Sequence, residues 1–150
     1  MTVHVLDTGA IFILLNKHRP RLRRALEEAY DRDSEAFPEM IRTPAPVLIE
    51  VGQASEPPKR KLEDILYLAP VSSLDKRIAQ IAADALRETE RAKCGECSGF
   101  VRPTLVDAVV MAMASDWAEG GMGDAIVYTQ DVDDMSALQP RFPKVQIQRV

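Results

Sequence analysis

The chain has 150 residues, of which 46% are hydrophobic and 28% are charged. This length and composition are typical of one globular domain with a sizeable core, and they exclude a disordered or fibrous chain. The formal net charge of −4 argues against a generic nucleic-acid-binding protein, because such proteins usually carry an excess of positive charge.

The chain shows none of the signs of export or membrane insertion. It begins without a basic region followed by an apolar run and a cleavage site, and no apolar run is long enough to span a bilayer. Two cysteines, Cys94 and Cys97, are consistent with a reducing compartment. We therefore expect a single cytoplasmic domain over residues 1–150, without an internal boundary.

Apolar periodicity predicts strands that alternate with helices along the chain. The expected strands cover 3–6, 40–44, 69–71, 125–129 and 145–150. The expected helices cover 10–15, 20–30, 46–54, 62–68, a long segment capped by Ser73 or Asp75, a segment from Thr104 as N-cap to Gly120 as stop, and part of 131–140. This order is typical of an α/β domain with a mostly parallel sheet and helices on both faces.

Several carboxylates stand where the pattern predicts burial. Asp7 separates the two apolar halves of "VHVLDTGAIFILL", and an unpaired buried carboxylate costs several kcal/mol. Asp107 interrupts an otherwise apolar run at 105–114, although "TLVD" also fits a capping box with Thr104. Glu50 lies among Leu48, Ile49 and Val51, where a solvated residue on an amphipathic helix is the simpler interpretation.

The position of Asp131 suggests that these acids share one site. Asp131 and Asp7 each follow a predicted strand, and ligands of open α/β sheets bind at the carboxyl ends of the strands. Asp131 alone is explained equally well by a turn or a helix cap. Together with Glu50 and Asp107, however, the two acids would repel one another unless a cation lay between them. An oxygen-only ligand set favours a hard ion, Mg²⁺ or Mn²⁺.

Four segments carry a resemblance to the PIN domain nucleases, in particular to the VapC-type toxins of bacterial type II toxin–antitoxin systems. They are "VLDTGAIFILL", "TPAPVLIEVGQA", "TLVDAVVMAMA" and "VYTQDVDDMSAL", in that order and over nearly the whole chain. The resemblance implies a PIN-like three-layer α/β/α domain with a mostly parallel central sheet. It also implies an endoribonuclease that uses one or two Mg²⁺ or Mn²⁺ ions, a cognate antitoxin protein as partner, and a homodimer.

The resemblance also assigns roles to individual residues. The catalytic and metal-binding acids would be Asp7, Glu50, Asp107 and Asp131, with Thr8, Thr129 and Asp134 as auxiliary residues. Many relatives carry a serine two residues after the first acid, where this chain has Gly9. A water activated by the metal would attack the RNA phosphate, so no protein nucleophile is needed. His4 and His18 are expected to be non-catalytic.

Basic residues follow two of the predicted turns. They are candidates for guiding RNA, although a solvated surface explains them as well: Lys17, Arg19, Arg21, Lys59, Arg60 and Lys61, with Arg23 and Arg24 beside them. "CGEC" at 94–97 lacks the second ligand pair of a structural zinc site.

Two other classes of protein compete with a nuclease. A haloacid-dehalogenase-like phosphatase needs a second aspartate where Gly9 stands, and a receiver-like domain needs a lysine after the fourth strand. A non-catalytic PIN-like module that acts through a protein partner remains the alternative function.

Overall fold

The structure, a computed structural model, describes residues 2–16, 20–32, 40–54, 56–93 and 102–150. Its centre is a five-stranded parallel sheet in the order β3-β2-β1-β4-β5, which confirms the predicted α/β class. The strands are β1 (Thr2–Leu6), β2 (Met40–Pro44), β3 (Val71–Ser72), β4 (Asp124–Thr129) and β5 (Val145–Arg149). The central strand β1 pairs with β2 on one side and with β4 on the other, so strands far apart in the sequence lie side by side in the middle of the sheet.

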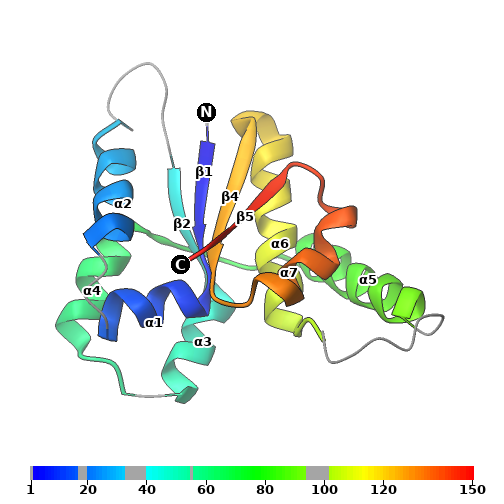
Figure 1. Cartoon of the computed structure of the whole chain (residues 1–150), viewed down its shortest axis with the longest axis horizontal. Coiled ribbons are helices and arrows are strands. Elements are labelled where there is room, and N and C mark those ends of the chain that lie inside the picture. The colour runs from blue at the N-terminus through cyan, green and yellow to red at the C-terminus, as the bar shows by residue number, and fades with distance from the viewer. Residues whose placement is uncertain (1, 17–19, 33–39, 55, 94–101) are drawn as a thin grey trace.

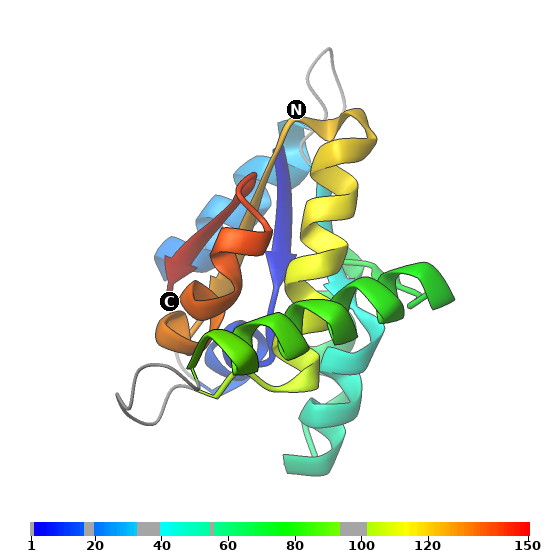
Figure 2. The same ribbon diagram turned by 90° about the vertical axis from the view of Figure 1, so that its right-hand side faces the viewer.

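Helices cover both faces of this sheet. One face carries α1 (Thr8–Asn16), α2 (Pro20–Arg32) and α4 (Lys59–Leu68), and the other carries α5 (Lys76–Lys93), α6 (Leu105–Trp117) and α7 (Val132–Leu138) (Figures 1 and 2). The helix α3 (Ala45–Ala54) follows β2 directly at the carboxyl end of the strands (Figure 1). This is the three-layer arrangement that the resemblance implies.

The apolar pattern explains how the layers pack. Val3, Val5 and Leu6 of β1 are fully buried, as continuous apolar strands are when helices cover both faces of a parallel sheet. The helix α6 is buried on most sides, since Ala108 to Ala114 are all part of the core. A polar side chain at the buried end of β1 or in α6 is therefore taken out of water by its neighbours.

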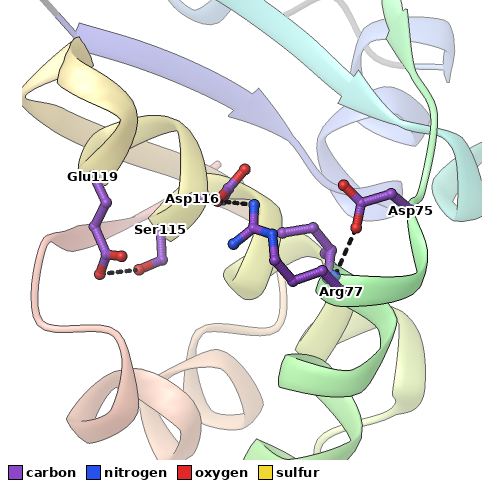
Figure 3. Close-up of polar contacts among 6 residues, drawn as sticks. Asp75, Arg77, Ser115, Asp116 and Glu119 are labelled. Atoms are coloured by element: carbon purple, nitrogen blue, oxygen red, sulfur yellow. Dashed lines mark hydrogen bonds and ion pairs between the residues drawn. The ribbon is translucent and has the colours of Figure 1, made fainter.

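A cap fixes the start of α5, and an ion pair joins this part of α5 to α6. The carboxylate of Asp75 accepts a hydrogen bond from the Ile78 amide at 2.8 Å, which confirms Asp75 as one of the two predicted caps. Next to it, Arg77 forms an ion pair with Asp116 of α6, and Ser115 donates to Glu119 one turn further on (Figure 3). These contacts hold α5 against the C-terminal half of α6, away from Asp107.

The predicted end of α6 is wrong in detail. The chain continues through a wider helical turn, Ala118–Met122, and turns at Gly121 and Gly123, with φ of 103° and 87°. Only residues without a Cβ adopt these angles at little cost, so these glycines end the segment and Gly120 does not.

Five residues of the sequence analysis lie outside the described residues: Lys17, His18, Arg19, Cys94 and Cys97. His4 is buried in the sheet, and its Nδ1 lies 2.9 Å from the hydroxyl of Tyr128 on the neighbouring strand. Within the described ranges, no helix is both long enough and apolar enough to cross a bilayer.

Candidate functional site

Asp7 occupies the carboxyl end of the central strand, where β1 passes into α1. Its side chain is buried, with 2% of the residue exposed, and its amide donates to the Tyr128 carbonyl at 3.1 Å. Burial raises the pKa of Asp7 from 3.8 to about 6, against the lowering effect of hydrogen bonds from Thr129 and Thr8. The negative charges of Asp107 and Glu50 raise this pKa further, which shows that the three carboxylates act on one another electrostatically.

Thr129 connects Asp7 to the loop that carries Asp131. The Thr129 hydroxyl donates to Oδ2 of Asp7 at 2.8 Å and accepts a hydrogen bond from the Asp131 amide at 2.9 Å. Thr129 is fully buried at the last position of β4, and its hydrogen bond to Asp7 is buried, whereas the one from Asp131 is only partly so. A single hydroxyl therefore fixes the first and fourth predicted acids relative to each other.

Glu50 comes to the same place from α3. Thr8 Oγ1 donates to Oε2 of Glu50 at 2.5 Å, and Glu50 is half-buried. Glu50 is therefore not an entirely solvated residue, since one of its oxygens is engaged by Thr8. Thr8 is the hydroxyl residue that the resemblance had left beside the first acid, and its hydrogen bond draws Glu50 toward the N-terminus of α1.

Asp107 enters from α6 and also caps that helix. The Thr104 amide donates to Oδ2 of Asp107 at 2.6 Å, and the Asp107 amide donates to the Thr104 hydroxyl at 3.2 Å. This confirms the predicted capping box. Burial raises the pKa of Asp107, and the nearby charges of Asp134 and Asp131 raise it further. Asp107 thus caps α6 and is also electrostatically coupled to Asp134 and Asp131. Its role as a helix cap therefore does not exclude a role in the site.

Asp131 stands at the N-cap of α7, but its side chain makes no capping hydrogen bond. The helix cap that would explain this carboxylate without a function is thus absent from this end of α7. Its backbone carbonyl accepts from the Met135 amide at 3.1 Å, which is the first bond of the helix. The structure therefore brings all four predicted acids, together with Asp134, to one edge of the sheet.

The donor set fits a divalent cation in its chemistry. All five side chains offer carboxylate oxygens, which hard ions prefer, and the raised pKa values of Asp7 and Asp107 mark a place that lacks positive charge. Among the described residues, however, no three acidic, histidine or cysteine side chains already form a ligand cluster. Asp7, Glu50 and Asp107 each accept a hydrogen bond from a threonine through one carboxylate oxygen, which leaves lone pairs on the other oxygen of each acid available to an ion.

A second feature, a cavity between α1, α2 and α4, was not found in the sequence analysis. Its volume is about 240 Å³, and its walls are mainly apolar, with two cations and one acid: Leu14, Leu15, Asn16, Arg23, Leu26, Lys61, Asp64, Ile65 and Leu68. Tyr30 and Tyr67, on the same helices α2 and α4, are exposed, with hydroxyl oxygens 3.5 Å apart. The sequence did contain a signal for this cavity, because α1 has apolar residues on two faces. One apolar face would be enough to pack on the sheet, so the second face indicates a further contact.

Comparison with solved structures supports the fold expected from the resemblance. One chain of VapBC2 from Rickettsia felis, bound to a DNA fragment from its promoter, matches with a TM-score of 0.65 and 19% identity, over 99% of this chain and 98% of that one. One chain of VapBC-1 from nontypeable Haemophilus influenzae matches with a TM-score of 0.57 and 15% identity, over 98% and 97%. No protein-family profile and no curated protein matches the sequence. At these identities the likeness establishes the fold, and the activity has to be argued from the site.

Proposed function

We propose that this protein is a divalent-metal-dependent endoribonuclease, a PIN domain toxin of the VapC type. The observation that carries the proposal is the meeting of Asp7, Glu50, Asp107 and Asp131 at the carboxyl edge of the sheet, with Asp7 buried and electrostatically coupled to two of the others. The fold shared with chains of VapBC complexes supports it. The structure explains why residue 9 is no aspartate, as a phosphatase of the competing class would require, because a Cβ there would lie 2.9 Å from Gln130.

Each residue of the site would have a role that follows from its position. Asp7, Glu50, Asp107 and Asp131 would hold one or two Mg²⁺ or Mn²⁺ ions, which supply charge stabilisation for the phosphate and an activated water. Thr129 and Thr8 orient Asp7 and Glu50, and Thr104 orients Asp107. Asp134 adds negative charge beside Asp107 and strengthens the attraction for a cation. The repulsion between these acids is what a bound cation would relieve.

Removal of the metal should abolish cleavage reversibly. We expect the purified chain to cut total cellular RNA with Mg²⁺ or Mn²⁺, to stop in EDTA, and to resume when the ion is added in excess. Mapping of the new RNA ends measures this result. If the protein binds RNA but makes no cut with either ion, the alternative function, a non-catalytic module that acts through a partner, replaces the nuclease.

The cavity between α1, α2 and α4 suits a protein partner, which we propose is a segment of an antitoxin. The matched structures are VapBC complexes, and the aliphatic side chains with Lys61 at the cavity favour an apolar segment that carries an acidic residue. Co-expression with the product of the neighbouring gene should yield a complex. Ile65→Lys, at a half-buried position of the cavity, should release the partner. If the wild type and Ile65→Lys recover the same amount of partner, the cavity is not the binding site.

A homodimer remains a prediction of the resemblance. Two large aliphatic side chains beside the acids are well exposed, Ile49 at 63% and Leu105 at 60%, and they are candidates for the surface that a second copy covers. Sedimentation equilibrium at micromolar concentration checks the dimer, and a monomeric mass for the wild type would contradict it.

We further propose that Arg21, Lys59, Arg60 and Lys61, with Lys17 and Arg19, guide RNA to the acids. Arg23 and Arg24 are bound to Glu27 and Glu28 within α2, which supports the simpler interpretation for these two. Lys59, Arg60 and Lys61 are exposed at the start of α4. Changing these three to Gln should reduce the log–log salt slope of RNA binding by about 2, at roughly 0.7 per phosphate contact. An unchanged slope would mean that this segment is only a solvated surface.

A further inference from the structure

Gly9 and Gln130 pack against each other where the first and fourth acids of the site meet. Gly9 is buried in the first turn of α1. A Cβ on residue 9 would lie 2.9 Å from Cγ of Gln130 and 3.0 Å from both its Cβ and its backbone nitrogen. The first of these separations is shorter than real Cβ contacts show, and the other two are tighter than nine in ten of them. The stem of Gln130 thus takes the space that a side chain on residue 9 would need.

The backbone of Gln130 is fixed on both sides. Thr129 before it donates to Asp7, and the amide of Asp131 after it donates back to the Thr129 hydroxyl. Gln130 itself is exposed, although Cβ and Cγ rest on Gly9. Its carboxamide begins one bond beyond Cγ. Because Cβ and Cγ of Gln130 are held in this way, its carboxamide is offered to solvent beside Gly9, the residue that follows Asp7 and Thr8.

The chemistry of a carboxamide differs from that of the acids in the site, and among the described residues the exposed carboxamide of Gln130, unlike the hydroxyls of Thr8 and Thr129, is not engaged in holding one of them. The five neighbouring acids are acceptors when ionised and repel phosphate, whereas Gln130 is neutral and both donates and accepts hydrogen bonds. An amide of this kind can form two hydrogen bonds to a base edge, or bind a ribose 2′-hydroxyl. RNA that places a phosphate at the acids has its next base or ribose within reach of a side chain at this position.

We propose that Gln130 contacts the RNA nucleotide beside the cleaved phosphate and helps to select the cleavage sequence, and that Gly9 provides the space for it. Gln130 is a specificity residue in this scheme, and no proton or metal passes through it. The proposal rests on the proposed ribonuclease function. It explains a departure from the resembling family, because the serine common after the first acid would displace Gln130.

The test compares Gln130→Ala with the wild type on the same RNA. We expect Gln130→Ala to keep cutting with Mn²⁺, to lose about tenfold in kcat/KM on the sequence that the wild type prefers, and to cut the other sequences at nearly the wild-type rate. The thermal midpoint should not move, because the residue is exposed. Gln80→Ala, at an exposed glutamine of α5, is the matched control and should leave both rate and preference unchanged.

Gly9→Ala examines the packing separately. A methyl group at residue 9 should force Gln130 away and reproduce the loss of preference, provided that circular dichroism shows a folded chain. If Gly9→Ala unfolds, Gln130→Ala alone decides the matter. A distribution of cut sites in Gln130→Ala identical to that of the wild type would overturn the proposal even though the nuclease is confirmed.

If the wild type cuts no RNA at all, the proposed function fails, and a binding experiment decides this inference independently. A pool of randomised single-stranded RNA is selected on the wild type and on Gln130→Ala. A motif that only the wild type enriches supports the contact with Gln130. Enrichment of the same motif by both proteins, or of none by the wild type, overturns it.

Discussion

Expression of the wild type in a bacterium should arrest growth, and Asp7→Asn should relieve the arrest completely. Asn has the same shape as Asp and can still accept the hydrogen bond from Thr129, but it removes the charge that would hold a cation. Charge stabilisation by a bound metal amounts to several kcal/mol, so we expect cleavage to fall by at least about 1,000-fold. The measurement is the rate of appearance of mapped RNA ends with purified protein, beside growth curves.

The control for this experiment is Asp124→Asn. Asp124 is an exposed aspartate at the first position of β4, the end of that strand opposite to Thr129, and it should keep the wild-type activity. Equal growth arrest by the wild type and Asp7→Asn, with equal RNA cleavage, would rule out toxicity through this site. Relief of arrest without any loss of cleavage would instead separate the toxicity from the nuclease.

The same substitution should stabilise the metal-free protein at neutral pH. The pKa of Asp7 is about 6 in the folded chain and 3.8 in the unfolded one, so the folded state holds its proton more tightly between these values. The free energy of unfolding of the wild type therefore falls as the pH rises from 4 to 6 and stays low above that range. A difference of about two pKa units corresponds to about 3 kcal/mol, which Asp7→Asn should recover in part at pH 7.5.

Urea denaturation in EDTA at pH 4 and at pH 7.5 measures this effect. Asp7→Asn should exceed the wild type at pH 7.5 and approach it at pH 4, where the folded wild type already carries the proton. Asp124→Asn should follow the wild type at both pH values. A variant that is less stable than the wild type at pH 7.5 would mean that the charge of Asp7 is already compensated in the fold. Addition of Mn²⁺ should stabilise the wild type more than Asp7→Asn.

Most of the fold could be predicted because each element carries its own local signal. The apolar run before Asp7, the capping box at Thr104 and the cap at Asp75 all appear where the residue types require them. The end of α6 was misplaced because three glycines lie within four residues, and the sequence alone does not show which of them take positive φ. The order of the strands could not be predicted from local sequence patterns either, because β1 pairs with β4 and their residues are more than a hundred positions apart.

The acids that meet at the edge of the sheet could be picked out in the sequence, but the hydrogen bonds that connect them could not. Acids among apolar neighbours are visible in the sequence, as Asp7 and Asp107 show. The hydrogen bond from Thr8 to Glu50 and the two bonds of Thr129 depend on side chains that meet only in the folded chain. The contact between Gly9 and Gln130 was missed for the same reason, because a glycine gives no sign of what takes the space beside it.

The place of β1 between β2 and β4 has a consequence for how the protein is made. Asp7 leaves the ribosome 122 residues before Thr129, which together with Asp131 completes its surroundings. A growing chain that ends before Asp124 has no partner for that side of β1 and no hydroxyl for the Asp7 carboxylate. The order of synthesis therefore keeps Asp7 apart from Thr129 and Asp131 until β4 has been made, so the four acids cannot meet at this edge of the sheet any earlier.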